Sequence, residues 1–473
     1  MSLPFWSLSN TDSSAPALIE DDVSIDYEEL SARVQEWVAR LDAIKSGKSF
    51  GFLVFPSSTA AIACYLACLN SKRHAPLLIQ PTLSDALLID LIQHFSPDWI
   101  VLPEDKRAVI QGFGEEIDAR DGLTLWRLQG SELEVHSDLA LLLNTSGSTG
   151  SSKLVRISYS AIDANARSIA EYLSLQSTDR AITTLPLAYS FGLSILNSHL
   201  FVGGALVLTD KTWLDRTFWV LAKEHLVTSL SGVPASFEIL YRLGLKRIAW
   251  PALRMLTQAG GRLREKLVVH FAEAAREASM EFFVMYGQTE ASPRISYLPP
   301  NRLAEKPNSI GIAVPGGTLQ VDPTTGELIY SGPNVMMGYA ENRQDLAKGD
   351  EMRGTLNTGD LAAIDEDGFF TITGRLKRFV KLSGNRFNLD DIERLLCNSL
   401  KMQVACTGAD DALRVVIVSE EENVPSVVKV LQDELRIFNG FVETRQVNSL
   451  PLMASGKVNY SALDALFRNE DSK

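Results

Sequence analysis

The chain has 473 residues, of which 45% are hydrophobic and 22% charged, the composition of an ordinary soluble globular protein. This length is too great for one hydrophobic core and indicates about two to four domains or subdomains. The formal net charge of −13 argues against a nucleic-acid partner or an anionic membrane surface, so an anionic substrate would need a local basic pocket.

The N-terminus has neither a basic region nor a long apolar run, and it does not resemble a signal peptide. The most apolar stretch, residues 50–69, is interrupted by Pro56 and three hydroxyl residues, which favours a buried strand and helix over a membrane span. The cysteines follow no metal-ligand pattern. We therefore expect a cytoplasmic protein without structural disulfides.

Up to about residue 374, apolar strand-like runs alternate with amphipathic helical segments. This alternation predicts an α/β fold with a largely parallel sheet covered by helices. The helical spacing predicts helices over 27–41, 59–69, 216–224 and 264–277, and the apolar runs predict strands over 50–55, 99–102 and 205–209.

From Gly311 onward the pattern changes to short strands and tight turns, with a hairpin predicted over 361–373 and its turn at Asp367-Gly368. A helix beginning near Leu389, a strand over 413–418 and a helix over 424–435 follow. We predict a large N-terminal domain of helix-covered β-sheets (1–374), with a small β-barrel-like, strand-rich subdomain (311–374). A small mobile α+β C-terminal domain (375–473) would follow a hinge at Gly374–Lys377.

A loop of small and hydroxyl residues lies between two apolar segments. Small residues allow a phosphate to approach the backbone, hydroxyls add donors, and Lys153 adds positive charge. The pattern predicts a polyphosphate site, although the P-loop pattern G-x-x-x-x-G-K-[ST] is absent. The alternative is a Ser/Gly surface linker. The loop residues are Thr145, Ser146, Gly147, Ser148, Thr149 and Gly150.

A second motif, Tyr286-Gly-Gln-Thr-Glu290, directly follows the apolar run 282–285. An aromatic ring can stack on a base, a hydroxyl can bond a phosphate, and a carboxylate can hold Mg²⁺. Taken alone, the motif could equally be a turn with a solvated Glu290.

Two further motifs lie toward the C-terminus. Asp360, in Thr358-Gly-Asp360, is suited to vicinal ribose hydroxyls because a carboxylate accepts two hydrogen bonds, and Arg375 follows in Gly374-Arg375. Lys457 ends the loop Leu450-Pro-Leu-Met-Ala-Ser-Gly-Lys457. Considered separately, the aspartate could be a turn residue and the lysine a solvated side chain.

In this order and at these separations, the four motifs resemble the adenylate-forming superfamily: acyl-CoA synthetases, peptide-synthetase adenylation domains and firefly luciferase. The resemblance extends from Tyr27 to Lys457. Further matching stretches are Leu185–Gly192, Gly232–Pro234, Ala259–Gly261, Gly326–Gly332, Met337–Tyr339, Gly374–Arg386 and Asp391–Glu393.

The resemblance implies an ATP- and Mg²⁺-dependent ligase that converts a carboxylic acid to an acyl-adenylate with release of pyrophosphate. The acyl group would then pass to a thiol of CoA or of carrier-protein phosphopantetheine. It implies that Lys457 bridges the substrate carboxylate and the α-phosphate. Lys377 would be the hinge residue, and Gly384 would line the thiol tunnel after domain rotation.

For ATP itself, the resemblance assigns the loop 145–150 and Lys153 to the β- and γ-phosphates. The remaining assignments place Tyr286 on adenine beside Gly260 and Gly261, Thr289 at the α-phosphate, Glu290 at Mg²⁺, and Asp360 with Arg375 at the ribose hydroxyls.

The acyl pocket departs from two familiar patterns at Tyr189. Many acyl-CoA ligases have a histidine there, and amino-acid-activating domains have an aspartate that pairs with the α-ammonium. Without that carboxylate an α-amino acid is disfavoured, because a buried ammonium needs a counter-charge. The expected pocket, suited to an aryl, small hydroxy-acyl or modest aliphatic acid, consists of Tyr189, Phe191, Val233, Ser236, Met285 and Ala291. Alternatively, Tyr189 and Phe191 only pack the core.

The leading hypothesis is a standalone carboxylate–thiol ligase acting on a small acid. Two alternatives are a ligase that transfers the acyl group to an amine or a carrier protein, and a non-catalytic relative that binds nucleotide or acyl-adenylate. The joint presence of Lys153, Glu290, Asp360, Arg375 and Lys457 argues against the non-catalytic alternative.

Overall fold

The computed structural model describes residues 3–9, 12–21, 23–144, 153–245, 250–376, 378–382, 385–409, 411–419, 424–453 and 457–468. Contacts divide the chain into two compact units. The first comprises residues 1–318 and 330–356, and the second comprises 319–329 and 357–473. The expected hinge at Gly374–Lys377 falls inside the second unit and stays a prediction, because a division by contacts does not locate a hinge.

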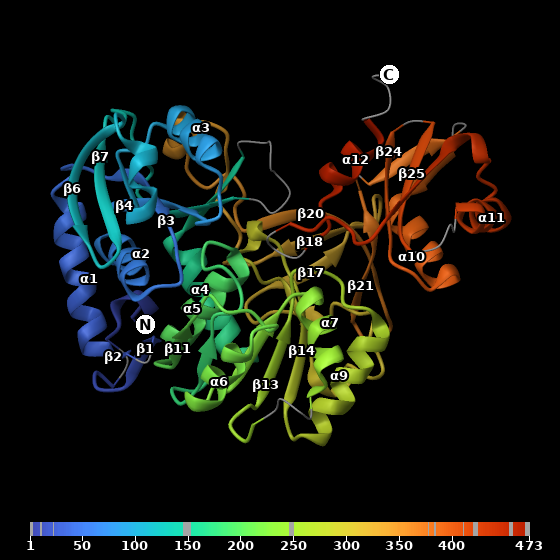
Figure 1. Ribbon diagram of the computed structural model, residues 1–473, viewed down its shortest axis with the longest axis horizontal. Coiled ribbons are helices and arrows are strands. Elements are labelled where there is room, and N and C mark those ends of the chain that lie inside the picture. Colours follow the sequence, from blue (N-terminus) through green and yellow to red (C-terminus); the bar gives the residue numbers. More distant parts are fainter. Residues whose placement is uncertain are drawn as a thin grey trace. The chain divides into compact units, whose positions relative to one another are not determined.

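The first unit contains a nine-stranded sheet whose central strands run parallel and whose outer strands are antiparallel (Figure 1). The N-terminal strand pairs with a strand far along the chain, with Leu18 opposite Leu206. In order, the sheet contains β16 (Ile312–Ala313), β15 (Ser296–Leu298), β14 (Glu281–Tyr286), β13 (Met255–Gln258), β12 (Ser229–Gly232), β10 (Arg180–Ile182), β11 (Ala205–Leu208), β1 (Pro16–Glu20) and β2 (Val23–Asp26).

The first unit also contains an eight-stranded sheet with a parallel centre and antiparallel edges. Its parallel strands are almost entirely buried, as expected for strands with both faces covered. In order, the sheet contains β19 (Gly338–Ala340), β9 (Leu154–Ser158), β8 (Leu139–Asn144), β4 (His74–Ile79), β3 (Ser49–Val54), β5 (Trp99–Pro103), β7 (Leu123–Leu128) and β6 (Gly114–Arg120).

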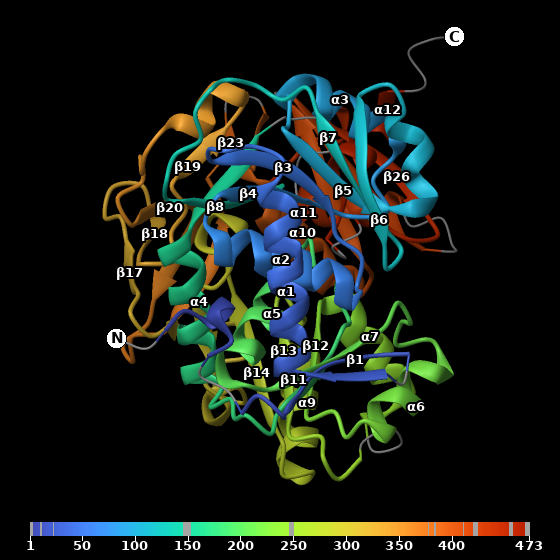
Figure 2. The ribbon, with the colours of Figure 1, turned by 90° about the vertical axis from the view of Figure 1, so that its left-hand side faces the viewer.

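Four helices contact the two sheets: α1 (Tyr27–Asp42), α2 (Thr59–Ser71), α4 (Tyr159–Tyr172) and α5 (Ser190–Val202). Helix α2 packs on β4 and helix α5 on β10 and β11, while α1 contacts α2 and α4 contacts α5. Figure 2 shows α1, α2 and α5 close together in this part of the molecule. Helices α2 and α5 are buried almost all round, which is why their sequences are apolar rather than amphipathic.

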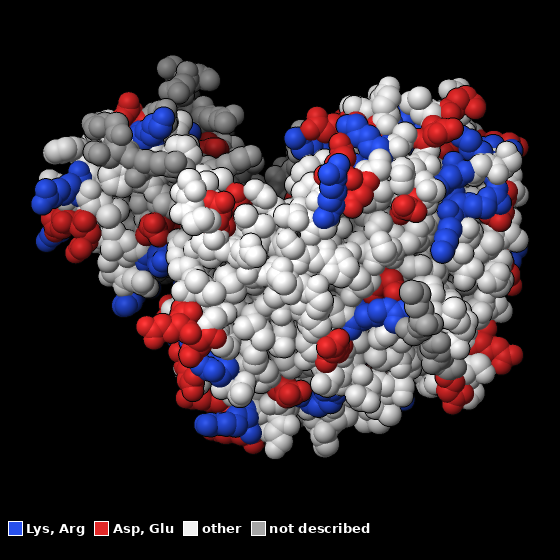
Figure 3. Space-filling view, turned by 180° about the vertical axis from the view of Figure 1, so that it is seen from behind, with Lys and Arg blue, Asp and Glu red and all other residues white. Residues whose placement is uncertain are grey.

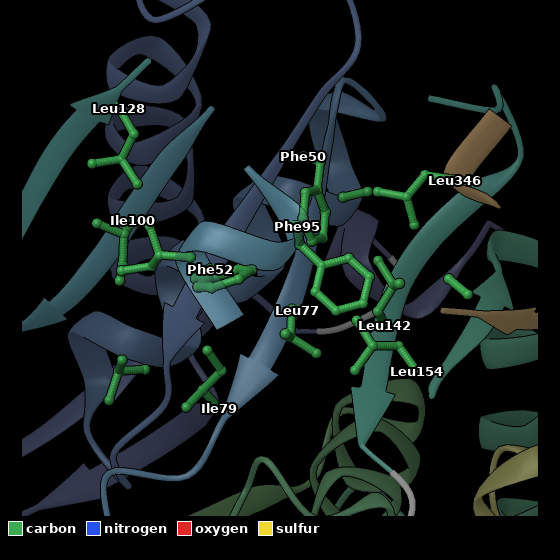
Figure 4. Packing of buried hydrophobic residues seen from close by; sticks show 14 of the residues in the cluster. Phe50, Phe52, Leu77, Ile79, Phe95, Ile100, Leu128, Leu142, Leu154 and Leu346 are labelled. Carbon is green, nitrogen blue, oxygen red and sulfur yellow. The ribbon is translucent and has the colours of Figure 1, made fainter. Parts of the chain in front are cut away.

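One core of the first unit gathers on the eight-stranded sheet (Figure 4). Phe50, Phe52 and Leu77 from adjacent strands pack with Phe95 of α3 (Asp85–Phe95) and Leu142 of β8. The predicted strand and helix over residues 50–69 are therefore confirmed as core elements, and the structure contains β3 and α2 there.

The outer helices of the first unit are amphipathic; α7 contacts β12, and α9 lies beside β14 (Figure 1). The outer helices are α6 (Arg216–Glu224), α7 (Pro234–Leu243) and α9 (Glu265–Glu277). Short 3-10 turns are η1 (Phe5–Ser7), η2 (Glu104–Ile110), η3 (Thr289–Ala291), η4 (Pro300–Arg302), η5 (Arg343–Ala347) and, in the second unit, η6 (Asn439–Phe441).

Most of the second unit consists of short strands and three helices among its described residues. The strand-rich segment forms a four-stranded sheet of β17 (Thr318–Val321), β18 (Glu327–Ser331), β20 (Thr355–Ile364) and β21 (Phe370–Arg375). The remaining elements are β22 (Phe379–Leu382), β23 (Asn385–Asn388), β24 (Val404–Ala409), β25 (Ala412–Val418), β26 (Val442–Val447), α10 (Leu389–Leu400), α11 (Val424–Leu435) and α12 (Tyr460–Arg468).

A partly buried ionic cluster holds the C-terminal elements of the second unit together. Arg378 forms ion pairs with Asp390 and, at 2.8 Å, with Glu393, both on α10. Its guanidinium carbon lies 4.0 Å from the ring centroid of Tyr460 on α12. Burial raises the pKa of Glu393, although Arg378 opposes this change. The cluster therefore joins α10 and α12 through one arginine.

Charged side chains of both signs are distributed over the described surface. On the face shown in Figure 3, basic and acidic side chains are interspersed rather than separated into regions of one sign. Among the described residues, no helix has both the length and the apolar character needed to cross a membrane. No disulfide joins the four cysteines, Cys64, Cys68, Cys397 and Cys406, all of which belong to the described part of the chain.

Candidate active site

Two sequence motifs that are far apart along the chain meet at Tyr339 of β19. The Tyr339 hydroxyl donates to Oε1 of Glu290 at 2.9 Å. Lys153 Nζ lies 5.8 Å from the centroid of the Tyr339 ring and 2.8 Å from Oε1 of Glu341. Burial, and next the Glu290 carboxylate, raise the pKa of Tyr339, so the phenol stays protonated and keeps donating. The expected phosphate-binding lysine and the expected metal-binding carboxylate thus both lie near one tyrosine.

The turn that carries Thr289 and Glu290 is tied down by buried hydrogen bonds. Asn334 donates from Nδ2 to the backbone oxygens of Ala291 (2.6 Å) and Arg294 (2.7 Å). The backbone N–H of Met336 donates to the carbonyl of Glu290 at 2.8 Å. These bonds hold the turn in one conformation, so the side chains at its start have defined directions.

Thr289 also contacts the start of α5. Its Oγ1 lies 3.3 Å from the hydroxyl of Ser190, and both side chains are buried. Ser190 directly follows Tyr189, the residue that precedes α5. The structure therefore brings the Thr289 motif next to the segment from which the acyl pocket is expected.

Tyr286 ends β14, and the next residue must be glycine. A Cβ at Gly287 would lie 1.6 Å from the carbonyl oxygen of Pro293, an impossible contact. Gln288 donates to the Tyr286 hydroxyl at 3.2 Å and orients the ring. The adenine-stacking role of Tyr286 stays a prediction. The tight turn after it requires glycine at position 287, because no side chain fits there.

The loop after β13 is close-packed at Gly260, one of the two glycines expected beside adenine. Gly260 has φ +82°, and a Cβ there would lie 3.0 Å from both the Tyr189 hydroxyl and Val233 Cγ1. Gly261 is more open, since its nearest neighbour would be Pro234 at 3.2 Å. The approach of Tyr189 and Val233 to Gly260 brings two expected pocket residues to the expected nucleotide loop.

The remaining expected pocket residues lie around the same segment. Tyr189 and Phe191 contact edge to face at 6.5 Å between ring centroids. The Tyr172 hydroxyl donates a hydrogen bond to Met285 Sδ at 2.9 Å. Ala291 is fully buried, whereas Ser236 is half-buried and packs near Gly232. Tyr189 and Phe191 are almost fully buried, so core packing stays open as their role.

In the second unit, Asp360 and Arg375 face each other across the β20–β21 hairpin. They are register partners, and Arg375 Nε lies 3.2 Å from Asp360 Oδ1. The Asp360 side chain is 9% exposed, whereas that of Arg375 is 54% exposed, so the carboxylate is fixed and the arginine reaches solvent. Their pairing supports the expectation that they act together.

The tail loop around Lys457 is held by a backbone bridge. The N–H of Met453 donates to the Lys457 carbonyl at 2.8 Å, and Leu452 pairs with Val458. Several expected site residues lie outside the described residues: the phosphate loop Thr145–Gly150, the hinge Lys377 and Gly384 of the thiol tunnel. Their roles stay predictions.

The carboxylate at Glu290 fits Mg²⁺ as the sequence suggested. Among the residues that the structure describes, no group of three or more acidic, histidine or cysteine side chains could hold a metal by itself. Mg²⁺ is usually bound through one or two carboxylates together with substrate phosphates and water. One carboxylate and the expected phosphate-binding lysine, both near Tyr339, agree with that mode, and both roles stay predictions.

Sequence reasoning missed four side chains of this region: Ser190, Arg294, Tyr339 and Glu341. Tyr339 and Ser190 lie in stretches that were recognised as typical, but nothing in their spacing indicated contact with Glu290 or Thr289. Arg294 follows a Ser-Pro pair and had no distinguishing signal, because its burial depends on contacts with α4 and α5.

The sequence profile of the AMP-binding enzymes matches residues 5–340, well over half of the chain. The chain belongs to the AMP-binding enzyme family. Among curated AMP-binding relatives, the indoleacetate–CoA ligase of Aromatoleum aromaticum is 28% identical over 67% of this chain and 65% of its own length. The 2-succinylbenzoate–CoA ligase of Bacillus pumilus is 30% identical over 58% of this chain and 56% of its own length.

Solved structures confirm the fold of this AMP-binding family member over its whole length. The o-succinylbenzoate CoA synthetase (MenE) of Bacillus subtilis, in complex with its acyl-adenylate intermediate, superposes with a TM-score of 0.80 at 21% identity. That match covers 100% of this chain and 98% of MenE. ATP-bound MatB from Rhodopseudomonas palustris gives a TM-score of 0.80 at 23% identity, with 99% of each chain covered.

These matches establish the mixed α/β fold with a large N-terminal and a smaller C-terminal part. The sequence matches themselves span less than two thirds of the curated relatives' own lengths. The activity, acceptor and substrate of this chain are therefore matters for proposal.

Proposed function

We propose that this protein is an ATP-dependent acid–thiol ligase. It would activate a small carboxylic acid to an acyl-adenylate, release pyrophosphate, and pass the acyl group to CoA or to a carrier-protein phosphopantetheine. The names of the curated relatives, which are CoA ligases, favour CoA as acceptor. A cytoplasmic location agrees with the use of ATP and CoA.

The observation that carries the proposal is the arrangement around Tyr339. Lys153 and Glu290 come from separate motifs, yet both contact this one side chain. A cation for phosphate oxygens and a carboxylate for Mg²⁺, held by a common neighbour, suit a polyphosphate substrate better than a solvated turn. The salt bridge of Lys153 with Glu341 is half-exposed, so an incoming phosphate can replace it at little cost.

In the first step, a carboxylate oxygen of the acid attacks the α-phosphorus, and the bond from the α-phosphorus to the bridging oxygen of pyrophosphate breaks. No proton is transferred, because the acid is already ionised at neutral pH. The protein's work is therefore positioning and charge neutralisation. Lys457 would neutralise the substrate carboxylate and the α-phosphate, and Thr289 would donate to the α-phosphate. Mg²⁺ held by Glu290 would neutralise phosphate oxygens.

In the second step, the sulfur of the thiol attacks the acyl carbonyl carbon. The bond from that carbon to the phosphate oxygen breaks, AMP leaves, and the thiol proton passes to solvent. Asp360 and Arg375 would hold the ribose hydroxyls through both steps, since a fixed carboxylate can accept from two vicinal hydroxyls.

The test is ATP–pyrophosphate exchange with a panel of aryl, aliphatic, hydroxy and amino acids. Lys457→Ala should lower exchange by at least about 100-fold, the scale seen when a preorganised charge-stabilising group is removed. Lys401→Ala changes an exposed lysine that directly follows α10; it is the matched control and should exchange like wild type. Folded protein that binds ATP but exchanges with no acid would support a non-catalytic nucleotide-binding relative.

The acceptor is decided by supplying acyl-adenylate with free CoA, holo-carrier protein or an amine. Thioester formation with CoA alone would establish a CoA ligase, and formation with the carrier alone would replace CoA by a protein partner. Amide formation would favour the amine-transferring alternative. Lys457→Ala should keep this second half-reaction, and an equal loss of both half-reactions would contradict separate roles for the two steps.

A further inference from the structure

Arg294 is a buried cation in the region where the acyl pocket is expected. It follows the Thr289–Glu290 turn, and only 3% of the residue is exposed. Its guanidinium carbon lies 4.2 Å from the ring centroid of Phe191, a stacked arrangement with an expected pocket residue. Stacking uses the face of the guanidinium, so its in-plane N–H groups remain directed at other partners.

The structure gives Arg294 no anionic partner. Among the described residues, no Asp or Glu oxygen lies within 4.0 Å of a guanidinium nitrogen of Arg294. Its buried Nε has no hydrogen-bond acceptor. Arg156 and Arg343, the other two arginines buried in the described part of the chain, pair with Glu351 and Asp98 respectively. A buried arginine that cannot lose its proton needs such a partner, because an unpaired charge is costly away from water.

The neighbours of Arg294 are phenols, and these remain neutral. Burial raises the pKa of Tyr172, and hydrogen bonding to Arg294 offsets only part of that rise. Burial likewise raises the pKa of Tyr189, with Arg294 opposing. Neither residue therefore supplies negative charge at neutral pH. The wall formed by Tyr172, Tyr189, Phe191 and Arg294 is left with one uncompensated positive charge.

A second buried donor lies on the same turn. Ser292 Oγ is buried without a hydrogen-bond partner. It lines a small cavity whose other polar linings are Ser190, Ser194 and Asn197, all of α5. The three α5 side chains have protein partners, whereas Ser292 Oγ and Arg294 Nε on the turn have none. In a site that binds ligands, such unsatisfied donors are commonly paired by the ligand.

We propose that Arg294 binds a second carboxylate of the acid substrate, remote from the carboxylate that is adenylated. The enzyme would then prefer dicarboxylic acids over monocarboxylic acids of the same skeleton. A planar guanidinium offers two parallel N–H donors to one carboxylate, which gives both charge compensation and orientation. This inference rests on the proposed ligase activity and narrows its substrate to one chemical class.

The experiment compares acids that differ only by a terminal carboxylate: butanoate with succinate, hexanoate with adipate, and phenylacetate with phenylenediacetate. In ATP–pyrophosphate exchange, wild type should show at least about tenfold higher kcat/KM for the dicarboxylic acid in one or more pairs. Arg294→Met should lose about 100-fold with that acid and less than about threefold with its monocarboxylic partner.

The matched control is Arg167→Met. Arg167 is also stacked on a phenylalanine, 4.8 Å from the Phe201 ring, but it has its own carboxylate in Asp163 at 2.6 Å. It should keep the wild-type preference. Arg294→Lys keeps the charge but not the paired donors, and it should restore part of the lost activity.

A separate readout is calorimetric binding of the dicarboxylic acid in the presence of a non-hydrolysable ATP analogue. Wild type should bind it at least about tenfold more tightly than Arg294→Met does. Equal use of both members of every pair by wild type, or equal loss with both members in Arg294→Met, would overturn this inference and leave the ligase proposal standing. Absence of exchange with every acid would instead refute the ligase activity, and this inference with it.

Discussion

Two regions of the first unit bury arginines in opposite ways. On the eight-stranded sheet, Arg343 lies 3.1 Å from Asp98, with both side chains 5% exposed, and Arg156 pairs with Glu351. Beside α5, Arg294 is equally buried and has no carboxylate among the described residues. In the first region a carboxylate of the protein balances the charge of each arginine, even though Arg343 Nε and Nη1 have no hydrogen-bond partner. In the second region no described carboxylate balances the charge, which is typical of a site that binds an anion.

Asp98 supplies the balancing charge in the first region. Besides Arg343, its carboxylate accepts from the Phe50 backbone N–H at 2.8 Å and from Lys45 at 3.1 Å. Arg343 also lies over the Phe50 ring at 5.1 Å. Figure 4 shows Phe50 within the core of this sheet. A charge pair at the edge of a core thus joins β3, β5 and η5.

The largest expected effect on stability is that of Asp98→Ala. It leaves Arg343 as an uncompensated buried cation and should lower the free energy of unfolding by about 3–5 kcal/mol. The measurement is urea unfolding of the full chain followed by circular dichroism. Asp85→Ala, which removes a 61% exposed carboxylate paired with Lys106, should cost less than about 1 kcal/mol. A similar small loss for Asp98→Ala would remove the basis of the comparison.

Buried histidines sharpen the comparison, because histidine can lose its proton and arginine cannot. Burial lowers the pKa of His199 and of His74 from the usual value of 6.5, although Asp42 opposes this change for His74. In the folded state both imidazoles therefore stay neutral to a lower pH than in the unfolded chain. As the pH falls, these histidines bind protons in the unfolded chain before they do so in the folded protein. Stability should therefore fall as the pH drops below about 6.5, by up to about 1.4 kcal/mol per pH unit for each histidine.

Urea midpoints at pH 7.5, 6.5 and 5.5 measure this dependence. His199→Asn keeps a donor for the Ile195 carbonyl and should flatten the fall, whereas His270→Gln, at an exposed position, should leave it unchanged. A midpoint that stays constant or rises between pH 6.5 and 5.5 would show that the folded state protonates these histidines as readily as the unfolded chain.

A smaller effect, on the Mg²⁺ requirement, is expected when Glu290 loses its hydrogen bond from Tyr339. Tyr339→Phe removes the hydrogen bond to Glu290, which is worth about 0.5–1.5 kcal/mol. The Mg²⁺ concentration for half-maximal exchange should rise by about 2- to 10-fold. Tyr241→Phe, with a 51% exposed side chain, is the control. An unchanged Mg²⁺ requirement would separate Tyr339 from the metal site.

The smallest change in stability is expected for Arg294→Met. Replacing an uncompensated buried cation with an apolar side chain should change the free energy of unfolding by less than about 1 kcal/mol, or raise it. The same urea experiment applies. A loss of 3 kcal/mol or more, comparable to Asp98→Ala, would mean that Arg294 is a structural residue whose charge the protein does compensate.

Local features were predictable from the sequence, and their spatial relations were not. The predicted helices over 216–224 and 424–435 match α6 and α11, and the hairpin turn at Asp367-Gly368 separates β20 from β21, because periodicity and turn chemistry are local properties. The division into two sheets depends on long-range pairing, such as β1 with β11. No local pattern contains that information.

The same distinction applies to the site. Motif spacing identified Lys153 and Glu290, and the structure places both against Tyr339. Arg294 was missed because its burial, and its lack of an anionic partner among the described residues, arise from three separate elements, α4, α5 and the turn after η3. An arginine in a sequence does not show whether an aspartate such as Asp98 will face it.

The pairing of β1 with β11 also affects the order in which the protein can assemble during synthesis. Leu18 cannot meet Leu206 until residue 206 has been translated, which takes roughly 10–40 s at typical rates of elongation. During that interval the N-terminal hairpin β1–β2 has an unpaired edge, and unpaired strand edges associate readily with other chains. A newly made chain therefore has a period of exposure to aggregation that a refolding chain of full length does not share.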